Sequence, residues 1–145
     1  MKVLGIDPGY GRCGVAIIDR VDGKDIHIFS TCIETSPRMS FPERLSVITT
    51  ECAYVMDRYK PEHIAMEKLF FKANKTTAMH VAEVRGSLIQ CATEHVIPLF
   101  EYTPAQIKSA TSGFGRAGKS QVAATLRMLM KIDKDRKSTR LNSSH

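Results

Sequence analysis

Three short apolar runs near the N-terminus, joined by tight turns, restrict the fold of this chain more than any other feature. The first run, residues 3–6, ends in an Asp-Pro-Gly turn, and the second, residues 13–19, ends close to Asp22-Gly23. An Asp-Gly pair between two apolar runs is a strong signal for a β-hairpin, and residues 26–33 supply a third strand. The sequence therefore predicts a three-stranded meander.

An amphipathic helix is predicted after the meander. Ser40 and Glu43 form a capping-box pattern, which is typical of the start of a helix. Apolar residues then recur at steps of three and four up to Tyr59, which is the spacing of one helix face. The Lys60-Pro61 pair indicates that the helix ends there.

A second, longer helix is predicted from Lys75 to Glu94. Its apolar side consists of Ala78, Val81, Ala82, Leu88, Ile89 and Ala92. Gly86 lies inside this helix, where glycine costs about 1 kcal/mol relative to alanine. Its presence indicates that another element packs closely against the helix at that position.

Two more strands and two more helices complete the pattern. Residues 63–66 form a strand, and residues 96–100 form another, in which Pro98 favours an edge position. The last helices are predicted to begin near Thr103 and Gly118. This order indicates one α/β domain with a five-stranded mixed sheet and helices on both faces.

Length and composition limit the class of protein. The chain has 145 residues, which is typical of one domain, and it carries 21 Lys and Arg against 15 Asp and Glu. The surplus of positive charge favours a polyanionic partner. There is no apolar stretch as long as a membrane span and no signal-peptide pattern, so we expect a cytoplasmic protein without a membrane partner. The four cysteines form no Cys-x-x-Cys pair, which argues against a zinc site or a disulfide framework.

The last eleven residues, 135–145, show neither apolar periodicity nor turn signals. They resemble the in-frame translation of a widely used sequencing adaptor, and we expect them to be non-native. The native domain would then be residues 1–134, which remains basic because only three of the 21 basic residues lie in the tail.

Two carboxylates are the first candidates for chemistry. Asp7 and Glu67 each follow an apolar strand. If the strands at 3–6 and 63–66 are parallel neighbours, about 4.8 Å apart, both acids lie at the same end of the sheet. Converging carboxylates suit a hard cation such as Mg²⁺. The alternative is that they are two unrelated acids in turns.

Aromatic residues lie among lysines directly after Glu67. Phe70 and Phe71 are flanked by Lys68 and Lys72. This composition is typical of surfaces that stack on bases and contact phosphates, so Phe70 and Lys72 are candidate nucleic-acid contacts. The alternative places the phenylalanines in the core.

A glycine-containing segment, residues 113–120, fits the nucleotide-binding pattern Gly-x-x-x-x-Gly-Lys-Ser. That loop must follow a buried strand, whereas residues 103–110 before it predict a capped helix. We therefore expect no nucleoside triphosphate as a partner. Arg116 and Lys119, beside Lys108, are instead candidates for holding phosphates.

Five motifs resemble those of a known family: GIDPG around Asp7, AMEKLFFKAN around Glu67, VAEVRG at 81–86, FEYTPAQIK at 100–108 and GKSQV at 118–122. Over residues 1–134 the chain resembles the RuvC family of bacterial Holliday-junction resolvases. The resemblance implies a ribonuclease-H-like, three-layer α/β/α fold and a homodimer. It also implies a structure-specific, Mg²⁺-dependent endonuclease that resolves four-way DNA junctions by symmetric nicking in recombination and repair, with the branch-migration complex as a further partner.

Particular residues match family positions. Asp7 and Glu67 match the first two of four carboxylates that bind two Mg²⁺ ions, and Phe70 matches an aromatic residue near the junction centre. Lys108 and Lys119 match basic residues that contact DNA at the active site, and we count Lys119 among the catalytic residues. The predicted long helix matches the family's dimer helix.

The C-terminal part departs from the family. The family's last two carboxylates form an Asp-x-x-Asp pattern on a C-terminal helix, and nothing here matches it. Asp133 and Asp135 are two residues apart, which would place them on different faces of a helix. We therefore expect a nuclease domain that lacks its last helix. The alternative function is junction binding without cleavage, because two of the four metal carboxylates are missing.

Overall fold

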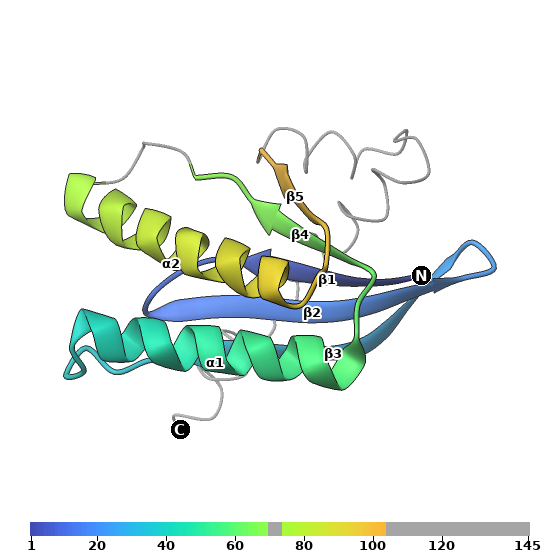
Figure 1. Ribbon diagram of the computed structural model, residues 1–145, viewed down its shortest axis with the longest axis horizontal. Coiled ribbons are helices and arrows are strands. Elements are labelled where there is room, and N and C mark those ends of the chain that lie inside the picture. Colours follow the sequence, from blue (N-terminus) through green and yellow to red (C-terminus); the bar gives the residue numbers. More distant parts are fainter. Residues whose placement is uncertain (70–73, 104–145) are drawn as a thin grey trace, which may run out of the picture.

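Five strands form one mixed sheet in the order β3-β2-β1-β4-β5 (Figure 1). The computed structural model describes residues 1–69 and 74–103. Its elements are β1 (Lys2–Asp7), β2 (Arg12–Val21), β3 (Lys24–Glu34), α1 (Phe41–Tyr59), β4 (His63–Glu67), α2 (Lys75–Glu94) and β5 (Leu99–Tyr102). β1, β2 and β3 pair antiparallel, whereas β4 pairs parallel with β1 and β5. The predicted meander and mixed sheet are both confirmed.

Local signals set the turns and the helix ends. Asp22 and Gly23 have positive φ angles of 52° and 77°, as a two-residue hairpin turn requires. The Ser40 hydroxyl accepts a hydrogen bond from the Glu43 backbone N–H at 3.3 Å. Lys60 adopts the left-handed conformation that ends α1. The bounds of α1 therefore follow from its caps, as the sequence predicts.

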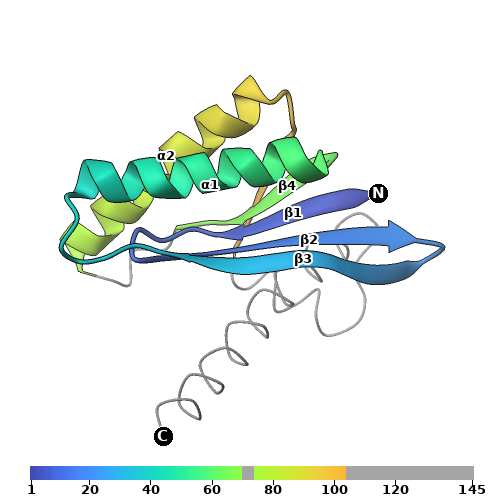
Figure 2. The same ribbon diagram turned by 90° about the horizontal axis from the view of Figure 1, so that it is seen from below.

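Both helices cover the same face of the sheet (Figure 2). Alternate residues of the central strands, such as Ile6 and Met66, belong to a buried core with Ile48 of α1 and Leu88 of α2. A smaller apolar cluster around Ala65 is separate from this core. The two helices predicted to begin near Thr103 and Gly118 lie outside the described residues, so helices on both faces of the sheet stay a prediction.

Three cysteines contribute small apolar side chains to the interior. Cys13, Cys52 and Cys91 are buried, and all four cysteines of the chain are free thiols. Burial and the two neighbouring thiols raise the pKa of Cys52, with a hydrogen bond to Cys13 as the largest cause. None of the described helices is long and apolar enough to cross a membrane.

Only part of the apolar side predicted for α2 is buried. Ala82 and Ile89 face solvent, whereas Val84 and Cys91 are buried. Successive helix residues lie 100° apart, so the predicted apolar residues spread over a wide arc of the helix surface. The positions of α1 and the sheet decide which part of this arc is buried. Gly86 also differs from expectation, because a Cβ at this position would meet no atom within 4 Å. No described element packs against the helix there.

β5 begins later than predicted. Val96 has a positive φ of 56° and is 87% exposed, so the chain turns there before the strand starts at Leu99. This conformation is uncommon for a β-branched residue, and no local pattern signals it. The Pro98 carbonyl accepts a hydrogen bond from the Ile64 N–H at 2.9 Å. β5 lies at an edge of the described sheet, as Pro98 predicted.

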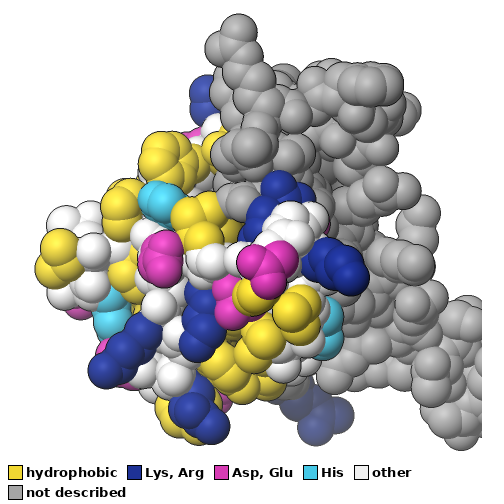
Figure 3. All heavy atoms as spheres, turned by 90° about the vertical axis from the view of Figure 1, so that its right-hand side faces the viewer, with side chains coloured by type: hydrophobic (Ala, Val, Ile, Leu, Met, Phe, Trp, Pro, Cys, Tyr) yellow, Lys and Arg dark blue, Asp and Glu magenta, His cyan; other side chains and the backbone are white. Residues whose placement is uncertain are grey.

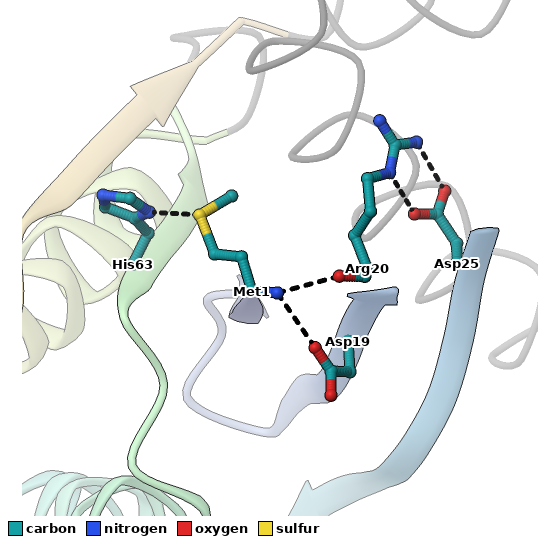
Figure 4. Close-up of polar contacts among 5 residues, drawn as sticks. All are labelled: Met1, Asp19, Arg20, Asp25 and His63. Carbon is teal, nitrogen blue, oxygen red and sulfur yellow. Dashed lines mark hydrogen bonds and ion pairs between the residues drawn. The ribbon is translucent and has the colours of Figure 1, made fainter. Parts of the chain in front are cut away.

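The end of the sheet that holds the N-terminus carries mixed charge. Figure 3 views this end and shows lysine and arginine side chains beside aspartate and glutamate. The Met1 amino group donates to the Asp19 carboxylate at 3.1 Å and to the Arg20 carbonyl at 2.8 Å (Figure 4). Arg20 pairs with Asp25 at 2.8 Å, and His63 Nδ1 lies 3.2 Å from the Met1 sulfur. These contacts tie the start of β1 to β2 and β4.

Ile48→Ala in α1 is expected to lower the free energy of unfolding by about 2–5 kcal/mol, because it removes a fully buried side chain. Tyr54→Ala is the matched control on the outer side of α1, where the residue is 62% exposed. We expect it to change stability by about 0.5 kcal/mol or less. Urea unfolding followed by circular dichroism measures both, and equal losses would contradict the assigned buried side.

Candidate active site

Asp7 and Glu67 end two neighbouring parallel strands. The register of β1 and β4 pairs Ile6 with Met66, so the next residue on each strand is an acid. Ile6 and Met66 point into the core under the helices, and side chains alternate along a strand. Asp7 and Glu67 therefore project on the other face of the sheet. The parallel pairing that the sequence suggested for these two strands is present.

The two carboxylates interact directly. Burial is the largest influence on the pKa of Glu67, and the negative charge of Asp7 and a hydrogen bond to Asp7 raise the pKa further. Arg85 acts in the opposite direction, and the result is a pKa of about 7 for Glu67. A pKa raised this far by burial and a neighbouring acid is typical of functional sites.

Gly9 shapes the turn between β1 and β2, directly after Asp7. A Cβ at this position would collide with the carbonyl oxygen of Arg12, so the backbone can make this close approach only with glycine. The Asp-Pro-Gly motif is thus required by the path of the chain, in addition to carrying an acid of the candidate site.

An aromatic cluster supports this turn. The Tyr10 ring packs edge-on against Phe41 of α1 and His80 of α2, with ring centroids 5.9 Å and 5.1 Å away. The Arg44 guanidinium lies 5.1 Å from the Tyr10 ring, and the Thr35 hydroxyl donates to the Tyr10 carbonyl. Sequence reasoning missed this cluster, because its members lie on four separate segments and follow no common spacing.

Arg85 is a second feature that sequence reasoning missed. This residue of α2 is only 7% exposed, and its guanidinium donates to the Glu67 carbonyl and to the Glu101 carboxylate. A signal was present in the sequence, since a basic residue stands between Val84 and Leu88 on the side of the helix that is otherwise apolar.

The remaining predicted site residues are Phe70, Lys72, Lys108, Arg116 and Lys119, and all of them lie outside the described residues. Their roles stay predictions. Lys68, directly after Glu67, is described and exposed, and its backbone N–H donates to the Tyr102 carbonyl at 2.8 Å. Within residues 1–69 and 74–103, no group of three or more potential metal ligands occurs.

Comparison with known proteins places these observations in one family. The sequence model of the family described as "Crossover junction endodeoxyribonuclease RuvC" matches residues 3–142. A relative of that name from Petrotoga mobilis is 42% identical over 134 residues, covering 92% of this chain and 82% of the relative. Another from Thermotoga maritima is 40% identical over 132 residues, covering 91% of this chain and 79% of the relative.

Solved structures give the same result for the fold. The Thermus thermophilus RuvC structure in complex with a Holliday junction substrate matches with a TM-score of 0.74 and 32% identity, over 89% of this chain and 79% of that one. A yeast mitochondrial Holliday junction resolvase shares the fold at a TM-score of 0.53 and 17% identity, over 76% of this chain and 56% of that one. The mixed sheet is therefore the ribonuclease-H-like α/β sheet that the motifs implied. Sequence identity, coverage and fold agree that the chain belongs to the RuvC family of crossover junction endodeoxyribonucleases.

Proposed function

We propose that this chain is a metal-dependent, structure-specific endonuclease that nicks four-way DNA junctions symmetrically in recombination and repair. The observation that carries this proposal is the Asp7–Glu67 pair at the carboxyl ends of two central parallel strands. Support for the substrate comes from the Thermus thermophilus relative, whose solved complex holds a Holliday junction. DNA as a substrate is also consistent with the basic composition of the chain. We also propose that the protein acts in the cytoplasm.

The acid pair fits a divalent metal ion. Both groups are hard oxygen donors, as Mg²⁺ prefers, and a bound cation would favour the ionised form of Glu67, which burial and the charge of Asp7 disfavour. We propose that Asp7 and Glu67 hold Mg²⁺, with two ions in a complete four-carboxylate site. When bound, such ions polarise the phosphate and stabilise charge on the attacking and leaving oxygens.

The chain's own basic and aromatic residues would bind and orient the DNA. We propose that Lys119 and Lys108 neutralise charge on the phosphate that is cut, and that Phe70 stacks on bases near the junction centre. Lys72 and Arg116 would contact neighbouring phosphates. These roles are supported by the motifs in which the residues occur, AMEKLFFKAN, FEYTPAQIK and GKSQV.

A second candidate function is junction binding without cleavage. It is favoured because, within the described residues, no group of three or more potential metal ligands occurs. In this proposal residues 1–134 form the nuclease domain and residues 135–145 are foreign, although the family match runs to residue 142. Reading the source DNA past codon 134 tests it, because an in-frame Asp-x-x-Asp helix would support the first function.

We also propose a homodimer through α2, and the branch-migration complex as a partner. The outer side of α2 carries Met79, Ala82, Gly86 and Ile89 at steps of three and four. Met79 is 64% exposed and Ile89 is 38% exposed, while the space beside Gly86 is open. Small residues between two exposed apolar ones would let a second copy of the helix approach closely.

Asp7→Asn is expected to lower the pKa of Glu67 in the metal-free protein, because it removes the negative charge beside that carboxyl. In the parent, Glu67 binds its proton more tightly in the folded chain than in the unfolded chain, and this difference adds to the free energy of unfolding. The contribution is complete below about pH 4.5, the ordinary pKa of glutamate, and it is lost as the pH rises through about 7. Carboxyl carbon NMR of labelled glutamate measures the titration. Asp57→Asn, on exposed α1 surface, is the control, and an unchanged titration in Asp7→Asn would contradict the pairing.

Asp7→Asn and Glu67→Gln are each expected to reduce Mg²⁺-dependent nicking of a labelled four-way junction by more than about 100-fold. Loss of a residue that only supports a metal ligand costs up to about 100-fold, and loss of a ligand itself should cost more. Junction binding, measured by gel shift, should be nearly unchanged and should fall steeply with salt. Full nicking by Asp7→Asn would exclude a metal role for Asp7. Junction binding without nicking by the parent chain would favour the second function.

Ile89→Glu is expected to convert a dimer into monomers, because it places a charge in the centre of the proposed α2 contact. Tyr54→Glu introduces the same charge on the exposed side of α1 and should leave the dimer intact. Sedimentation equilibrium of the parent and both variants gives the masses. A dimer that survives Ile89→Glu, or that is lost equally in both variants, would contradict the α2 contact.

A further inference from the structure

Arg85 is the one charged side chain that is buried among the residues that the structure describes. Removing a guanidinium from water is expensive unless hydrogen bonds and an opposite charge compensate for it. A hydrophobic residue at this position of α2 would fill the core at lower cost. The position therefore indicates that the interactions of Arg85 serve more than packing.

The guanidinium of Arg85 joins three elements. One terminal nitrogen donates to the backbone carbonyl of Glu67, the last residue of β4, and the other donates to the carboxylate of Glu101 on β5. The side chain itself extends from the middle of α2. A planar fork with two donors can hold both partners in fixed geometry, which the single ammonium group of lysine cannot do.

The carbonyl that Arg85 binds lies where the central ladder stops. The pairing of β1 with β4 ends at Ile6 and Met66, and Pro8, which follows directly after β1, has no N–H with which to extend it. On the other side of β4, Glu67 is paired with Tyr102 of β5. Arg85 thus supplies a donor to the main chain of Glu67 beyond the last β1–β4 pair.

We propose that Arg85 is a positioning residue for the candidate metal site. By holding the Glu67 main chain against Glu101, it fixes the carboxylate of Glu67 beside Asp7 in the arrangement that accepts a divalent cation. This inference rests on the proposed function, because it takes Asp7 and Glu67 as the metal ligands. Supporting groups around metal ligands typically change metal affinity by about 10- to 100-fold when they are removed.

The test is Mn²⁺ binding to the full chain, followed by the loss of the free-ion EPR signal in a titration into the millimolar range. Arg85→Met keeps an unbranched, flexible side chain as far as the start of the guanidinium and removes both donors, so we expect about tenfold weaker Mn²⁺ binding or more. Arg85→Lys should lose less, and Glu101→Gln should shift in the same direction. All proteins are measured at a temperature where their unfolding curves show a fully folded chain.

Leu88→Ala is the matched control, one turn further along α2. It removes a fully buried side chain that has no polar contact with β4, so it lowers stability without touching Glu67. Its Mn²⁺ affinity should equal that of the parent. Equal losses of affinity in Leu88→Ala and Arg85→Met would show a merely structural role for Arg85 and overturn the inference.

Asp7→Asn separates this inference from the function on which it rests. If the parent binds Mn²⁺, Asp7→Asn loses it and Arg85→Met binds like the parent, the positioning role is overturned and the metal site stands. If Asp7→Asn binds like the parent, or the parent binds no Mn²⁺, the metal site fails and the positioning role fails with it.

Discussion

Parallel hydrogen bonding between β1 and β4 places Ile6 beside Met66 at the centre of the sheet, and most other features of the structure depend on this register. It turns alternate apolar side chains of both strands toward α1 and α2. It also brings Asp7 and Glu67 together on the opposite face. A slip by one residue would exchange the two faces, so burial of the core and formation of the acid pair are the same constraint.

This arrangement places two carboxylates close together where both are partly removed from water. Glu67 is half-buried, and burial together with the neighbouring charge of Asp7 raises its pKa to about 7. Without a cation, full ionisation of the acid pair is therefore unfavourable. The structure surrounds it with restraints: the glycine turn after Asp7, the aromatic cluster around Tyr10, and the buried guanidinium of Arg85. Conflicts of this kind, held by the surrounding fold, are characteristic of functional sites.

In helix α2, the tertiary structure decides which of the apolar residues are buried. Its bounds were predicted correctly, but Ala82 and Ile89, which belong to the predicted apolar side, face solvent. Apolar residues lie all around this helix, so periodicity alone could not distinguish a side that packs on the sheet from one available to a second copy of the chain. Gly86, beside which a Cβ would meet open space, lies on the exposed side.

The sequence by itself determined the hairpin at Asp22-Gly23, the helix cap at Ser40, the order of the elements and the motifs of the family. These depend on residues within a few positions of one another, where backbone sterics and short-range hydrogen bonds decide. Only the tertiary structure decided the inward side of α2, the late start of β5, the raised pKa of Glu67 and the partners of Arg85. Each of these depends on segments that are far apart in the chain, because their packing sets the distances between side chains and removes some of them from water. No local pattern encodes this packing.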